Sequence, residues 1–118
     1  MLGKTVWTIA DGFMSDTKTE KFVSHEAVCV LNLSGEKADI KISVYFEDEA
    51  PIKGFTAECE SERTNHIRLD KIVNDKGEKI PTEKPYALLI ESTVPVIVQH
   101  SRLDVSQPDM TLMTTIAY

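Results

Sequence analysis

Apolar and polar residues alternate over short stretches along the whole chain, and turn residues separate these stretches. The clearest stretch is residues 38–46, where Ile40, Ile42 and Val44 alternate with polar residues. A two-residue period places successive side chains on opposite faces of a strand, so one face here belongs to the core and the other to solvent or an interface. No stretch shows a helical period. The pattern therefore predicts β-strands alone.

About eight such stretches follow one another at intervals of roughly eight to twelve residues, which is the spacing of sandwiches and barrels. The predicted strands are residues 4–10, 22–33, 38–46, 52–60, 63–69, 86–91, 94–103 and 111–117. We expect the strands 86–91 and 94–103 to pair across Ser92 and Thr93, and we expect residues 14–21 and 70–85 to form the long loops. The predicted fold is all-β, a single-domain antiparallel β-sandwich of about eight strands over residues 1–118.

Composition agrees with a soluble globular protein, since 42% of the 118 residues are hydrophobic and 27% are charged. No apolar run reaches the eighteen or so residues of a membrane-spanning helix, so no membrane insertion is expected. The first residues enter strand-like sequence directly and lack the pattern of a secretion signal. We therefore expect a cytoplasmic protein.

The net charge of -6 comes without any cluster of Lys or Arg, so nucleic acid is not an expected partner. Cys29 and Cys59 lie at strand-like positions outside any metal-binding spacing. A disulfide between them does not fit a reducing compartment, and we expect free thiols.

Residues 94–104 form the most informative stretch, because a β-branched apolar run changes there into polar sequence without a turn residue. By the strand period, Val96, Val98, His100 and Arg102 share one face. A strand whose apolar face continues into His and Arg borders a binding site, an interface or the solvent-exposed end of a sandwich.

Polar groups interrupt three strands, at residues 24–26, 63–68 and 99–104, and each group holds one of the three histidines. No two histidines have the close spacing that anchors a metal, so no metal site is expected. Ser24 and Ser101 each precede or follow a histidine that points to the opposite face, and no nucleophile elbow is present. Neither enzymatic activity nor a cofactor is expected.

A site for a polar small molecule is the remaining chemical interpretation. The side chains that suit hydroxyl and carboxylate groups are Glu26, His66, Arg68, Gln99, His100 and Arg102. Trp7 supplies an apolar platform of the kind on which sugar rings stack.

A structural interpretation stays open for the same residues. Trp7 fits a core, Glu26 fits an ion pair with Arg68 or Arg102 across strands, and Asn32 fits a turn cap. Arg63 and Asp104 fit solvated strand ends. Outward-facing Tyr45 and the weakly charged residues 111–118 favour assembly, which would bury these groups between subunits.

Several segments in order along nearly the whole chain resemble the sensory rhodopsin transducer family of small bacterial proteins. They are residues 7–12, 24–26, 28–29, 31–32, 63–68, 94–104 and 115–118. The resemblance implies a homotetrameric β-sandwich that acts as a cytoplasmic transducer or ligand-sensing domain, with a sugar-like metabolite as ligand and a receptor or regulator protein as partner. The alternative is a protein-interaction adaptor whose polar residues hold subunits together. The ligand-binding residues that the family resemblance implies are Trp7, His25, Glu26, Asn32, Arg63, His66, Arg68, Gln99, His100, Arg102 and Asp104.

Overall fold

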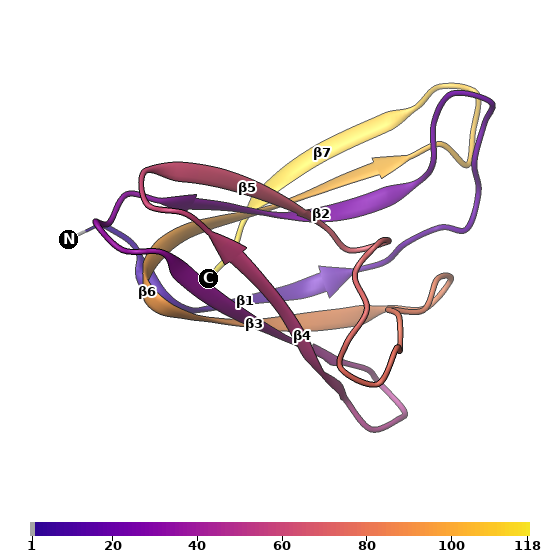
Figure 1. Cartoon of the computed structure of the whole chain (residues 1–118). Coiled ribbons are helices and arrows are strands. Elements are labelled where there is room, and N and C mark those ends of the chain that lie inside the picture. The colour runs from indigo at the N-terminus through magenta and orange to yellow at the C-terminus, as the bar shows by residue number, and fades with distance from the viewer. Residues whose placement is uncertain (1) are drawn as a thin grey trace.

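The computed structural model describes residues 2–118, and in this range seven antiparallel β-strands form two packed layers without a helix (Figure 1). The all-β class predicted from the alternation is confirmed. The strands are β1 (Lys4–Gly12), β2 (His25–Asn32), β3 (Ala38–Tyr45), β4 (Ile52–Cys59), β5 (Arg63–Arg68), β6 (Tyr86–Asp104) and β7 (Thr111–Ile116).

Strand β6 belongs to both layers. Its first half pairs with β3 up to Ser92 and with β1 as far as Val96, and β4 completes this first layer. Its second half, from Ile97, pairs with β2 and β7, and β5 completes the second layer. Figure 1 shows β6 curving from one layer into the other. The chain thus places residues near Tyr86 and residues near His100 in facing layers.

The predicted pairing of residues 86–91 with 94–103 is wrong, because β6 is one continuous strand of 19 residues. Ser92 and Thr93 do not supply the positive φ angles that a two-residue hairpin needs. The chain bends there instead, and Pro95 is not a partner residue in the ladders of β6 with β1, β2 or β3, so its missing N–H is tolerated. Seven strands therefore replace the expected eight.

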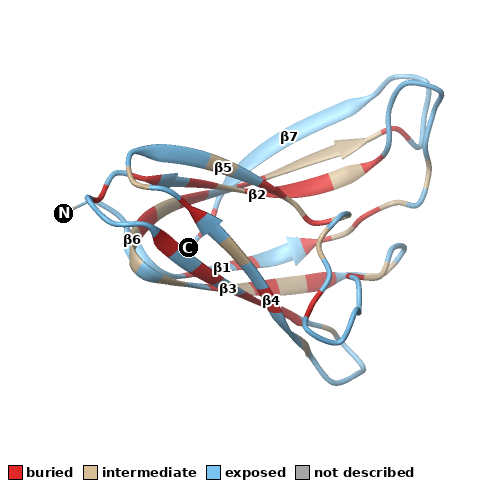
Figure 2. Cartoon of the chain, viewed as in Figure 1, coloured by how far each residue is buried: buried red, intermediate tan, exposed pale blue. Residues whose placement is uncertain are grey.

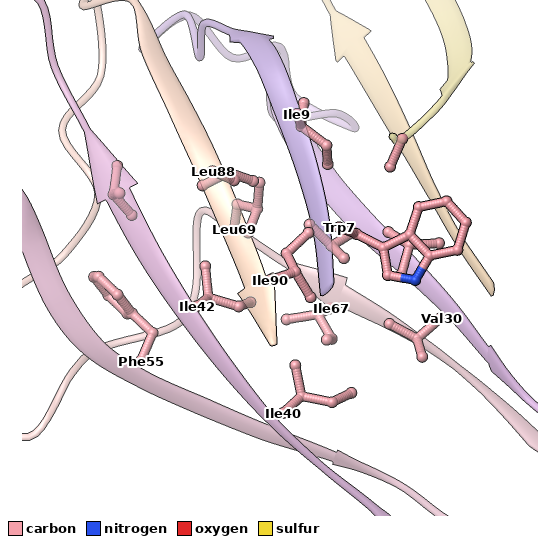
Figure 3. Close-up of a cluster of buried hydrophobic side chains, with 14 of the residues drawn as sticks. Trp7, Ile9, Val30, Ile40, Ile42, Phe55, Ile67, Leu69, Leu88 and Ile90 are labelled. Carbon is pink, nitrogen blue, oxygen red and sulfur yellow. The ribbon is translucent and has the colours of Figure 1, made fainter. Parts of the chain in front are cut away.

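The core lies between the layers and follows the predicted alternation (Figure 3). Ile40, Ile42 and Val44 are almost completely buried, as their period predicts. Trp7 lies in the same cluster, and its indole N–H donates to the carbonyl oxygens of Val96 at 2.9 Å and Lys4 at 3.0 Å. Burial of this apolar surface is the main stabilising contribution to the sandwich.

Residues after β7 connect it to the first layer. Backbone hydrogen bonds join Thr8 and Tyr118 in both directions, and the Lys4 ammonium lies 4.3 Å from the Trp7 ring centroid and 4.5 Å from that of Tyr118. The outer edge of β7 has no partner strand in residues 2–118, and all of its residues are exposed (Figure 2). Among the described residues, no helix is long and apolar enough to cross a membrane.

Candidate ligand-binding site

Glu26 is the centre of a buried polar cluster inside the sandwich. The alternation of β2 turns Glu26, Val28 and Val30 toward the core, and the side chain of Glu26 is 0% exposed. In the ladder between β2 and β6, Glu26 stands directly opposite Arg102. The two side chains therefore share one face, and Arg102 Nε donates to Glu26 Oε2 at 2.6 Å.

Four donors converge on the Glu26 carboxylate. Oε1 accepts from the Tyr86 hydroxyl at 2.5 Å and from His100 Nε2 at 2.7 Å, and Oε2 accepts from Arg102 and from the Phe13 N–H at 2.9 Å. A buried carboxylate is tolerated only when such donors replace water. We call Glu26, Tyr86, His100, Arg102 and the Phe13 N–H the Glu26 network.

The network keeps Glu26 ionised. Burial by itself raises the pKa of this carboxyl group, but the hydrogen bonds from His100, Tyr86 and the Phe13 N–H outweigh burial, and the pKa lies below its ordinary value. Burial and the neighbouring negative charge of Glu26 both raise the pKa of Tyr86, so this hydroxyl stays protonated and donates. The cluster is thus a carboxylate surrounded by permanent donors.

The network also ties the two layers together. Tyr86 begins the first-layer half of β6, whereas Glu26, His100 and Arg102 belong to the second layer. Arg102 Nη2 further donates to the carbonyl oxygen of Asp11 at 3.3 Å, so the end of β1 is held as well.

Gly12 makes room for Tyr86. A Cβ at position 12 would lie 2.4 Å from the Tyr86 ring, a separation that real Cβ atoms do not show. The absence of a side chain there lets the ring pass β1 and reach Glu26.

A cleft of about 290 Å³ opens beside the network, between β1 and β7. Residues 8–11 of β1 form one wall, Met113, Thr115 and Ile116 of β7 form the other, and the nearly buried His100 contributes to the lining. Thr115 stands directly opposite His100 in the ladder between β6 and β7. The volume of the cleft lies near the lower end of the range for ligand pockets.

His100 presents an unused nitrogen to this cleft. A carboxylate only accepts hydrogen bonds, so His100 Nε2 donates to Glu26, and Nδ1 is the second ring nitrogen. Nδ1 makes no hydrogen bond to residues 2–118, and in that range no fully buried side-chain nitrogen or oxygen lacks a partner. Nδ1 is therefore reachable from the cleft, and Glu26 fixes the ring that carries it.

Of the residues predicted for a site, the structure brings Glu26, His100 and Arg102 together and places the others elsewhere. Arg68 forms a two-bond ion pair with Asp70, both bonds at 2.8 Å. Burial of Asp70 raises the pKa of that carboxyl group, but the hydrogen bonds and charge of Arg68 lower it further, so the pair stays ionised. Trp7 is a core residue covered by Lys4.

Asn32 caps the turn that follows β2. Its side-chain oxygen accepts from the N–H and hydroxyl of Ser34, and its amide donates to the carbonyl oxygens of Glu36 and Cys59. Arg63 is exposed and donates to the adjacent Glu62 carbonyl. These two residues serve the ends of β2 and β5, away from the cleft.

The remaining predicted residues lie on the outer face or at the rim of the second layer. His66 and Gln99 are exposed and flank Cys29 in the outward row across β5, β2 and β6. His25 Nδ1 lies 2.8 Å from the Val23 carbonyl oxygen. Asp104 accepts from the Ser106 N–H at 2.8 Å, and hydrogen bonding from the Ser106 side chain and backbone lowers the pKa of Asp104.

Sequence reasoning missed two members of the Glu26 network. Tyr86 opens an aliphatic run and has the pattern of a core residue, and the donor at Phe13 is a backbone group that no sequence pattern reveals. Cys29 and Cys59 are free thiols, as expected. Within residues 2–118, no three His, Cys, Asp or Glu side chains are placed to hold a metal ion.

Comparisons with known proteins support the fold. A family model described as Anabaena sensory rhodopsin transducer matches residues 2–118. The crystal structure of Thermotoga maritima 1070 is 42% identical, with a TM-score of 0.89 over 100% of this chain and 96% of that one. The Anabaena sensory rhodopsin transducer is 34% identical, with a TM-score of 0.77 over 91% of this chain and 94% of that one. No curated protein matches the sequence.

Proposed function

Because the chain belongs to the Anabaena sensory rhodopsin transducer family, we propose that it is a cytoplasmic signalling module that senses a small, hydroxyl-rich molecule such as a sugar-like metabolite. The ligand binds in the cleft between β1 and β7. The observation that supports this proposal is the free Nδ1 of His100, which reaches the cleft while buried Glu26 holds the opposite ring nitrogen.

The cleft has the chemistry that a polyol requires. A ligand hydroxyl can hydrogen-bond to His100 Nδ1, and the Thr115 hydroxyl and Asp11 carboxylate add hydrogen-bonding groups at the walls. Ile9 and Met113 supply apolar contact for C–H groups. Few polar groups placed within an apolar lining are typical of small-molecule sites.

Binding at His100 also has a route to the rest of the molecule. The Glu26 network connects the ring to the Phe13 N–H and, through Arg102, to the Asp11 carbonyl oxygen. The loop that begins at Phe13 is thus attached to the same carboxylate as the ligand-binding histidine. A ligand that favours one arrangement of this loop shifts the population toward it, and this shift is the proposed signal.

The test is a thermal-shift screen against sugars and sugar acids, with Thr115→Val and Thr114→Val as a matched pair. Thr114 precedes Thr115 on β7 and points to the opposite face, so its variant controls for the loss of a hydroxyl. A ligand at about one hundred times its Kd stabilises the native state by about 2.7 kcal/mol. We expect that shift in wild type and Thr114→Val and a smaller one in Thr115→Val. If no compound in the screen raises the melting temperature of the wild type, the proposal is contradicted.

One observation favours the second candidate function, a protein-interaction adaptor that forms a homo-oligomer, with a tetramer expected from the family resemblance. The outer edge of β7 has no partner strand within residues 2–118, and β7 exposes Leu112 and Ile116 at 71% and 80% and carries no charged residue. An edge of this kind pairs with a further strand unless it is blocked. A flat thermal response together with dissociation of the oligomer in Ile116→Lys, measured by light scattering, favours the adaptor over the sensor.

A further inference from the structure

The outer face of the first layer carries two adjoining concavities that are separate from the Glu26 network. Their volumes are about 530 and 560 Å³, and both are lined by Lys41, Thr56 and Glu91. Each volume falls within the range of small-molecule sites. We call the two together the outer groove. No member of the Glu26 network lines it, so any ligand of the groove is bound independently of His100.

Two opposite charges stand side by side where the concavities meet. Lys41 of β3 faces Glu91 of β6 on one side and Thr56 of β4 on the other. Within residues 2–118, neither Lys41 nor Glu91 forms an ion pair. Nearby Asp39 and Glu58, in contrast, are already paired with Lys37. Lys41 and Glu91 are the charged side chains that remain available at this point.

A fixed wall closes one side of the groove. Asn74 is buried, and its side-chain amide donates to the Lys53 carbonyl oxygen at 2.8 Å. Gly54 has a φ of 92°, and a Cβ there would lie 2.5 Å from Asp75 Oδ1, so the missing side chain admits the Asp75 carboxylate. Lys53 and Asp75 add a second pair of opposite charges to the lining.

We propose that the outer groove binds a small zwitterion, a molecule such as a free α-amino acid that carries both an ammonium and a carboxylate group. The ligand carboxylate accepts from Lys41 and the ligand ammonium donates to Glu91, which gives a charge-assisted hydrogen bond at each end. Around the concavity beside the loop at Asp75, the charges of Lys41, Lys53, Asp75 and Glu91 balance, which matches a neutral molecule with separated charges. Asp39 and Glu58 of the other concavity share Lys37. Tyr45 and Leu89 offer apolar surface to the ligand's side chain.

Competition from the protein itself is weak. Lys41 and Glu91 are both exposed, and an exposed Lys–Glu pair contributes little to stability. A ligand that satisfies both groups at once therefore replaces any transient contact between them at small cost. A polyol offers only dipoles to these charges, and the zwitterion is the better match.

The experiment is a titration of the ¹⁵N-labelled protein with individual free L-α-amino acids, followed by amide chemical shifts. For each amino acid that binds, its carboxamide and its N-acetyl derivative serve as controls, because each lacks one of the two charges. We expect shifts at residues 41, 56 and 91 with at least one amino acid and none with either derivative.

Variants of the charged pair complete the test. Lys41→Gln and Glu91→Gln should each weaken binding by about threefold or more, since each removes one ion pair at an exposed residue. The control variants are Lys71→Gln and Glu20→Gln, which remove the same charges from exposed residues outside the groove. Both should bind the amino acid as the wild type does. Absence of shifts at these residues with every amino acid overturns the proposal. Equal binding of the singly charged derivatives or of sugars, or unchanged affinity in Lys41→Gln, also overturns it.

Discussion

Replacing Tyr86 with Phe isolates one bond of the Glu26 network. The substitution removes only the hydroxyl that donates to Glu26 Oε1 at 2.5 Å, leaves three other donors on the carboxylate, and keeps the ring that fills the space beside Gly12. A hydrogen bond to a charged group contributes about 1.5–3 kcal/mol. We therefore expect the free energy of unfolding to fall by about 2 kcal/mol, a sizeable part of the roughly 5–15 kcal/mol of a typical domain.

Equilibrium urea unfolding at pH 7 measures this change, because the midpoint reports stability and the slope reports the surface exposed on unfolding. Tyr45→Phe is the matched control. Tyr45 is 37% exposed, and its hydroxyl makes no hydrogen bond to residues 2–118, so its loss should change the free energy by less than about 0.5 kcal/mol. If Tyr86→Phe is as stable as Tyr45→Phe at an unchanged slope, the bond between Tyr86 and Glu26 makes no net contribution, and our account of how the layers are held is refuted.

Three further substitutions test other parts of the structure by the same urea assay. Because the pKa of Glu26 is lower in the folded state, its ionised form stabilises the protein above about pH 4.3, and this contribution is lost as the pH falls through the lower folded-state pKa. Stability should thus fall less steeply from pH 7 to 3 in Glu26→Gln than in wild type, and parallel curves contradict this. Asn32→Ala should cost about 3 kcal/mol, since it removes buried hydrogen bonds at the turn after β2, and a loss below about 1 kcal/mol contradicts that role. Gly54→Ala should cost about 1–3 kcal/mol through its positive φ and its contact with Asp75, whereas Gly35→Ala, with open space around it, should be close to neutral. Equal stability of the two glycine variants contradicts the expected strain at position 54 in Gly54→Ala.

The period of apolar residues was sufficient to predict most strands and part of the network. Ile40 and Ile42 face the core as their alternation predicts. The same period placed His100 and Arg102 on the inward face of β6, and a cross-strand pair of Arg102 with Glu26 was one of the expected alternatives. These features depend on the local geometry of a strand, which the sequence encodes directly.

Features that depend on the bending of sheets could not be predicted in this way. To predict that β6 continues through Ser92, one must know which strands flank each of its halves. This pairing is set by residues far away in the chain. Tyr86 meets Glu26 only because β6 bends between the layers. The outer groove arises where β3, β4 and β6 curve beside the loop at Asp75, and no motif marks it. Long-range packing, rather than local preference, decides these contacts.

The position of β6 in the chain has a consequence for synthesis. Before β6 leaves the ribosome, the strand pairs β2–β5 and β3–β4 can form, but β1 has no partner, because Thr8 pairs with Leu89. The central strand of both layers thus arrives almost last, and the nascent chain exposes unpaired strand edges until then. Contacts between residues so far apart in sequence also slow folding. A nascent chain that ends before Asp104 lacks the full central strand and cannot complete the second layer.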